Sequence, residues 1–140
     1  MRISRKGEYG LAAILYLASQ PTGKLSLGDE IAGRCGIPRN FLAQILARLR
    51  SQGILGSVRG KRGGYYLKAE PGRLSLADVL EALEGPITLI RAIKEDEGQD
   101  ADFLNTRVRD FFSRLQARGY DLLHSMKIAE MLPTSEREKP

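Results

Sequence analysis

The sequence predicts a mainly α-helical fold with one small β-hairpin: a winged helix-turn-helix domain followed by a long C-terminal dimerisation helix. Three observations support this prediction. Apolar residues recur at helical spacing in three segments before residue 53, and two β-prone runs then flank a Gly-rich centre. Near the C-terminus, a proline-free stretch repeats its apolar residues about every 3.5 positions, as a helix packed against another helix does. A chain of 140 residues can hold one such domain and an oligomerising helix.

Three helices are expected first. Ser4 can cap the first helix, and Ser26-Leu-Gly-Asp29 has the form of a capping box for the second, which stops at Gly36. Pro38 suits the first turn of the third helix, which ends at Gly53. Two helices joined by a short glycine-containing turn are typical of a helix-turn-helix. The expected apolar faces are Tyr9, Ala13, Tyr16 and Leu17 in the first helix, Leu27, Ile31 and Cys35 in the second, and Phe41, Leu42, Ile45, Leu46 and Leu49 in the third.

A β-hairpin is expected directly after the third helix. Ile54, Leu55 and Val58 precede the segment Arg59-Gly-Lys-Arg-Gly-Gly64, and Tyr65-Tyr-Leu67 follows it. A hairpin in this position is a wing, and its tip carries three cations and three glycines. The composition changes after residue 72, so we divide the chain into a DNA-binding domain, residues 1–73, and an effector and dimerisation region, residues 74–140.

The second region is expected to be helical. Ser75-Leu-Ala-Asp78 is another capping box, and the helix that it opens closes at Gly85-Pro86. One long helix is expected from about residue 102 to 132; it would span about 45 Å, more than so small a domain can cover. A symmetric homodimer is the favoured way to bury its seam, and packing against the chain's own first half is the alternative. The seam comprises Val108, Phe112, Leu115, Gly119, Leu122 and Met126.

The charge is unevenly distributed. The net charge of +5 combines +9 in residues 1–73 with −4 in residues 74–140. No acidic residue occurs between Glu30 and Glu70, an interval that contains eight Lys and Arg residues. A basic segment of this kind attracts a polyanion, chiefly through counterion release, although solubility alone is the simpler explanation.

Base-reading residues are expected at the start of the third helix. Asn40 and Gln44 lie one helical turn apart, opposite the apolar face, and Arg39 stands beside them. Asn and Gln can bridge the adenine edge and Arg the guanine edge in the major groove. Because a recognition helix reads bases with its N-terminal residues, we assign Arg39, Asn40 and Gln44 to base reading.

Other cations are expected to contact the DNA backbone or the narrow groove. The wing residues Arg59, Lys61 and Arg62 suit a narrow groove, where glycine allows close approach. A nucleotide-binding loop is rejected because the spacing of the glycines does not match the Walker pattern. The candidate phosphate contacts are Ser4, Arg5 and Lys6 at the first helix, and Arg48 and Arg50, which could instead hold the domain together.

Several classes of protein are disfavoured. No apolar run is long enough for a membrane span and no secretory signal is evident, so a cytoplasmic protein is expected. The single cysteine, Cys35, is expected to be a small core residue, and with one histidine, His124, no metal site or catalytic triad is predicted. The acidic segment Lys94–Asp102 misses the spacing of a calcium loop.

The sequence resembles the Rrf2 family of bacterial winged-helix regulators. The resemblance rests on residues 1–11, on Ile37-Pro-Arg-Asn-Phe-Leu-Ala-Gln-Ile-Leu-Ala-Arg-Leu-Arg50, on residues 53–65 with Ser-Val-Arg-Gly and Gly-Gly-Tyr, and on Leu74–Gly85. It implies a homodimer on pseudo-palindromic double-stranded promoter DNA, usually a repressor, with the third helix in the major groove and the wing in the minor groove. Family members that bind an iron–sulfur cluster use three cysteines in the interval that corresponds to residues 88–103, and this chain has none there.

The resemblance therefore implies the branch of the family without a cofactor, whose signal comes from a small-molecule or protein effector. Two alternatives stay open. One is a regulatory interaction protein whose C-terminal half docks on a metabolic enzyme, with weak DNA contact, and the other is a nonspecific nucleic-acid binder.

Overall fold

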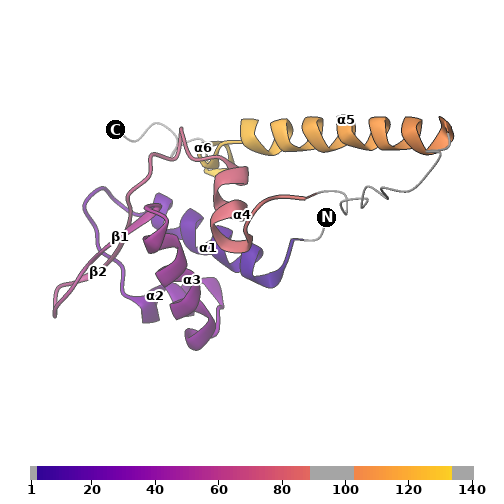
Figure 1. The fold of residues 1–140 in the computed structure, drawn as a ribbon. Helices are drawn as coiled ribbons and strands as arrows, with labels where there is room; N and C mark the ends of the chain where they lie inside the picture. Colours follow the sequence, from indigo (N-terminus) through magenta and orange to yellow (C-terminus); the bar gives the residue numbers. More distant parts are fainter. Residues whose placement is uncertain (1–2, 89–102, 134–140) are drawn as a thin grey trace.

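The computed structural model describes residues 3–88 and 103–133 (Figure 1). The helices α1 (Arg5–Ser19), α2 (Gly28–Cys35) and α3 (Arg39–Ser51) come first. The strands β1 (Leu55–Val58) and β2 (Gly64–Leu67) follow and pair antiparallel, with Leu55 opposite Leu67 and Val58 opposite Gly64. The helices α4 (Leu76–Glu84), α5 (Phe103–Ser125) and α6 (Ile128–Met131) complete the order. The predicted fold class, a winged helix-turn-helix with a long C-terminal helix, is confirmed.

One hydrophobic core joins both predicted regions. The predicted apolar residues of α1 and α3 supply Ala13, Leu17 and Leu49, and α4 contributes Val79 and Leu83 to the same cluster. Only Leu27 among the expected core residues of α2 lies outside the core, with 55% of its surface exposed. The composition after residue 72 thus changes in its charge, while one hydrophobic core includes residues from both sides of this position. The division into two functional regions stays a prediction.

The two predicted capping boxes have different outcomes. Ser75 accepts a hydrogen bond from the Asp78 N–H at 3.0 Å, and the Asp78 carboxylate accepts one from the Ser75 N–H at 2.9 Å, so the box at α4 is confirmed. The box at Ser26 is wrong: α2 begins at Gly28, with Leu27 as its N-cap residue and no side-chain cap. The Ser26 N–H is already donated to the Tyr65 carbonyl at 3.0 Å and is not free to bond Asp29. Similarly, Pro38 precedes α3 as its N-cap residue and is not in its first turn.

The long C-terminal helix is shorter than predicted. It ends at Ser125, so α5 spans about 35 Å, and Met126 and Lys127 separate it from α6. The Met126 carbonyl accepts a hydrogen bond from the Leu76 N–H, and the Ile128 N–H donates to the Leu74 carbonyl, both at 2.8 Å. These bonds hold an extended segment that carries Ile128 into the core, where it is fully buried. Figure 1 shows the C-terminal part of α5 beside one end of α4, with the rest of α5 extending well away from it.

Candidate nucleic-acid interface

A glycine fixes the turn between α2 and α3. Gly36 adopts a left-handed conformation with φ of 66°, which is unfavourable for residues with a Cβ atom. The N–H of Ile37 then bonds the Ala32 carbonyl at 3.0 Å, and the Ile37 side chain is buried. The turn sets the direction of α3, whose apolar face packs on α1, α2 and α4 and leaves the opposite face exposed.

The three predicted base-reading residues all lie on the exposed face of α3. Within the described part of the chain, Asn40 and Gln44 make no side-chain hydrogen bond. The Arg39 Nε atom lies 3.4 Å from the Asp29 Oδ1 atom, in an ion pair whose two side chains are mostly exposed. Such exposed pairs are weak, so the guanidinium can exchange Asp29 for a base edge or a phosphate. The sequence did not predict the pairing of Asp29 with Arg39, because the two residues lie on different helices.

The tip of the wing presents uncompensated positive charge. Arg59, Lys61 and Arg62 are exposed, and no carboxylate within residues 3–88 and 103–133 lies within ion-pair distance of them. The turn is closed by a hydrogen bond of 3.0 Å from the Gly63 N–H to the Gly60 carbonyl. The tip can therefore offer its cations to an external anion without first breaking internal pairs.

The base of the wing is fixed to the segment before α2. Tyr65 and Ser26 exchange two backbone hydrogen bonds, of 2.8 and 3.0 Å. At Gly64, φ is +152° and an added Cβ would lie 2.8 Å from the Ser26 carbonyl oxygen, while a Cβ at Gly63 would lie 2.0 Å from the Val58 carbonyl oxygen. These two glycines are buried and allow the backbone to pack closely at the base of the wing. The sequence had suggested a different role for them, in which they let the wing tip approach a narrow DNA groove closely.

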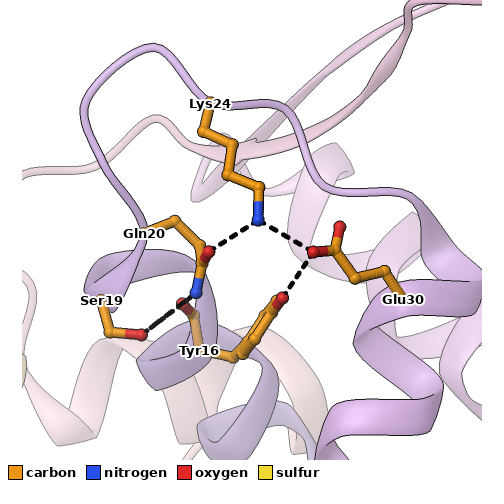
Figure 2. A network of polar contacts seen from close by, with 5 residues as sticks. All are labelled: Tyr16, Ser19, Gln20, Lys24 and Glu30. Carbon is orange, nitrogen blue, oxygen red and sulfur yellow. Dashed lines mark hydrogen bonds and ion pairs between the residues drawn. The ribbon is translucent and has the colours of Figure 1, made fainter.

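A polar network holds the loop between α1 and α2 (Figure 2). The Tyr16 hydroxyl and the Lys24 ammonium both donate to the Glu30 Oε1 atom at 2.8 Å. Lys24 also donates to the Gln20 Oε1 atom at 2.9 Å. The hydrogen bonds from Lys24 and Tyr16 lower the pKa of Glu30, while burial and then Glu30 raise the pKa of Tyr16. The network fixes the start of α2 and hence the frame of the helix-turn-helix. Sequence reasoning missed it because no local motif links these residues.

The predicted phosphate contacts fall into two groups. Arg5 is exposed and Lys6 is half-buried, at the start of α1, and both stay candidates. Ser4 caps α1 by accepting from the Gly7 N–H, and its hydroxyl also donates to the Glu84 carboxylate.

The two arginines at the end of α3 contact the chain itself. The Arg48 Nε atom donates to the Ala82 carbonyl at 2.8 Å, and the Arg50 Nη1 atom donates to the Ser57 hydroxyl at 3.2 Å. These bonds join α3 to α4 and to β1, which is the alternative role that the sequence left open for them.

The predicted dimer seam forms an exposed apolar stripe along α5. Val108, Leu115 and Leu122 have 47%, 49% and 61% of their surface exposed, and Phe111 beside them has 66%. A different side of α5 contacts α4 and the segment that follows it, where the Gln116 side chain donates to the Ile87 carbonyl at 3.0 Å. The alternative of burying the seam against the chain's own first half is therefore wrong for the described residues. Phe112 and Met126 are also exposed, Gly119 is half-buried, and Met126 lies just beyond the end of α5.

Within the part of the chain that the structure describes, the side chains that could serve catalysis or bind a metal do not converge. The Cys35 Sγ atom lies 3.7 Å from the Ala12 carbonyl, between α2 and α1, and burial raises the pKa of its thiol. The His124 ring stacks on Tyr120 and lies 3.4 Å from the Ser75 hydroxyl. Within the described residues no three His, Cys, Asp or Glu side chains gather as metal ligands would. The acidic segment at 94–102 lies outside the described residues. The described helices also include none that is long and apolar enough to span a bilayer.

Comparison with known proteins agrees with this geometry. Residues 3–134 match the model of the Rrf2 family, described as iron-dependent transcriptional regulators. The HTH-type transcriptional regulator CymR of Bacillus subtilis is 36% identical over 111 residues, which cover 79% of each chain. The regulator IscR of Xenorhabdus nematophila is 32% identical over 139 residues, 97% of this chain and 82% of that one. A putative HTH-type regulator of Mycobacterium tuberculosis is 43% identical over 94 residues, and the match spans only 58% of its length.

Solved structures show the same fold. The structure of CymR, the global cysteine regulator of B. subtilis, superposes with a TM-score of 0.78 at 27% identity, covering 94% of this chain and 95% of that one. The IscR structure of T. potens gives a TM-score of 0.71 at 27% identity, covering 94% and 85%. The resemblance noted in the sequence is thus confirmed, and the chain belongs to the Rrf2 family of transcriptional regulators.

Proposed function

We propose that this chain is a sequence-specific, double-stranded-DNA-binding repressor that acts as a homodimer in the cytoplasm. One observation carries the proposal: Asn40 and Gln44 are exposed on α3, and the wing that follows this helix presents three cations that have no carboxylate partner within the described residues. Polar side chains on a helix can read base edges, and unpaired cations release counterions from phosphates. The absence of acid between Glu30 and Glu70 supports the same role.

The exposed stripe on α5 supports the dimer. Apolar area left in water costs about 25 cal/mol per Å², and a second copy of α5 can cover the stripe in a symmetric interface. A two-fold dimer offers two identical basic faces, so its preferred site is pseudo-palindromic, with half-sites spaced by the helical repeat of DNA.

The residues of this chain do not fit an iron–sulfur cluster, although the family is described as iron-dependent. Such a cluster needs several thiolates, and the whole sequence contains only Cys35. Its thiol sits in the contact between α1 and α2, where burial raises its pKa and disfavours the thiolate. We therefore place the chain in the branch without a cluster. Its activity is binding and not catalysis, and an effector of another kind controls it.

Selection of bound sequences from a random duplex pool tests this function. We expect one pseudo-palindromic sequence to be enriched and to bind at least about 1,000-fold more tightly than random duplex, with an affinity that falls steeply as salt is raised. Equal affinity for selected and random duplex would show that the protein is a nonspecific nucleic-acid binder. No binding above background would favour the alternative in which residues 74–140 dock on an enzyme.

A further inference from the structure

A cavity of about 870 Å³ lies away from the base-reading residues of α3. Its walls come from three parts of the chain that are distant in the sequence: the end of α1 with the loop to α2, the β-hairpin with the loop after β2, and α6 with the residue that follows it. Small-molecule sites in proteins have volumes of about 300 to 1,000 Å³, so the cavity has the size of a metabolite site. The apolar part of its lining includes Leu17, Leu25, Tyr66 and Leu132.

One wall of the cavity is fixed before any ligand arrives. The loop between α1 and α2 is held by the network of Figure 2, in which Lys24 bonds both Gln20 and Glu30. The opposite wall is held by the hydrogen bond of 3.0 Å from the Ala129 N–H to the Pro71 carbonyl, which joins α6 to the loop after β2. A preformed site costs less free energy to occupy than one that must first be ordered.

The charges around the cavity favour an anion. Lys24 is neutralised by Glu30, and Glu70 is paired with Arg73 at 3.2 Å. Lys68 also lines the cavity, is exposed, and has no carboxylate within ion-pair distance among the described residues. One positive charge is therefore left uncompensated beside an apolar wall.

We propose that this cavity binds a small organic carboxylate, with its apolar body against Leu17, Tyr66 and Leu132 and its carboxylate on Lys68. Such a ligand would touch the wing strand β2 and the segment that follows α5 at the same time. It would thus occupy the place where an effector can influence both surfaces of the proposed regulator. Binding in the cavity is nevertheless a property of the protein alone and is measured without DNA, so its failure is separable from a failure of the proposed function.

The chain contains no tryptophan, which provides a direct test. A Tyr66→Trp variant places a single tryptophan in the cavity wall as a fluorescent reporter, and the variant is titrated with octanoate and with the uncharged octanamide. We expect a saturable change with octanoate and about tenfold weaker binding of octanamide, because a charge-assisted hydrogen bond is lost. Lys68→Gln in the same background should weaken octanoate binding about tenfold and leave octanamide unchanged.

Two further variants complete the test. Lys61→Gln removes the same charge at the wing tip, outside the cavity, and should leave octanoate binding unchanged. Ala18→Phe fills the cavity from α1 and should abolish binding of both ligands, with the circular dichroism spectrum as a check that the variant is folded. The absence of a saturable signal, equal affinities for octanoate and octanamide, or equal effects of Lys68→Gln and Lys61→Gln would overturn the proposal.

Discussion

Two exposed surfaces of the molecule differ in chemistry. One is the face formed by α3 and the wing, and the other is the apolar stripe along α5. On α3 and the wing, the exposed groups are Asn40, Gln44 and three cations, all of which water hydrates well. On α5, the exposed groups are leucine, valine and phenylalanine side chains, which water solvates poorly. Among the described residues, the three wing cations have no counter-charge, and the apolar stripe on α5 has no packing partner.

This difference sets how each surface is used. An exposed cation without a counter-charge costs little free energy because water hydrates it. The basic face can therefore bind and release a duplex, with an affinity that depends on salt concentration and DNA sequence. An apolar stripe gains free energy whenever it is covered, so its partner is expected to stay bound. The comparison predicts a lasting dimer contact on α5 and a reversible DNA contact on α3 and the wing.

The largest effect is expected from a charge placed in the apolar stripe. Leu122→Glu should give a folded monomer whose DNA affinity falls about 100- to 10,000-fold, because two linked half-site contacts become one. Light scattering on a sizing column and a DNA titration measure the two effects. Ser113→Glu is the matched control, since nine residues separate the two positions and place them on opposite sides of α5. A Leu122→Glu protein that stays dimeric would show that the apolar stripe on α5 is not the dimer interface.

Base reading by α3 should give the next effect. Gln44→Ala should cost about 1–3 kcal/mol on the selected duplex and change the base preferred at one position, while binding to random duplex stays nearly constant. Competition titrations with single-base variants of the duplex measure this. Equal losses on selected and random duplex would show that Gln44 does not read a base.

The wing should affect all sequences alike. Arg62→Ala should weaken binding to selected and random duplexes by the same factor, of about threefold to tenfold, and reduce the slope of log affinity against log salt by about 0.9 per protomer. Arg114→Ala removes an arginine from α5, where it pairs with Asp110 at 3.0 Å, and should leave the slope unchanged. A loss confined to the selected duplex would assign Arg62 to base reading.

The smallest effect is expected from the polar network that holds the loop between α1 and α2. The pKa of Glu30 lies below its usual value of 4.5 because Lys24 and Tyr16 donate hydrogen bonds to its carboxylate. The charged form of Glu30 therefore stabilises the fold at pH values above 4.5, and this stabilisation is lost as the pH falls through the lowered pKa. Glu30→Gln should therefore lower the unfolding temperature slightly at pH 7 and not at pH 2. The loss is small because the ion pair is about one-third exposed. Thermal melts of both proteins across this pH range measure it, and a constant difference would contradict the assignment.

Local sequence signals predicted most of the fold, and the two Ser-x-x-Asp segments show their limit. At Ser75, the strand-like bonds run through the neighbouring Leu74 and Leu76, which leaves the Ser75 N–H free for Asp78. At Ser26, the bond to Tyr65 uses that N–H. The two segments have the same sequence pattern, and they differ only in whether a distant strand residue takes up the serine N–H.

The same reason explains the error in the long helix. No proline or glycine marks its end, and Ser125 is followed by residues that could continue it. Tertiary hydrogen bonds to Leu74 and Leu76 and the burial of Ile128 outweigh helical continuation. The exposure of Arg39, Asn40 and Gln44 followed from periodicity alone, whereas the contacts of Arg48 with Ala82 and of Asp29 with Arg39 depend on how helices pack.

The number of chains bound to one duplex shows whether the protein acts on DNA as a two-fold dimer. Sedimentation velocity of the full-length protein with one selected duplex, and with the same duplex cut to a single half-site, gives the mass of each complex. We predict two chains on the intact duplex and binding at least about 100-fold weaker to the half-site. One chain per intact duplex, with equal affinity for the half-site, would show that the protein does not bind DNA as a dimer.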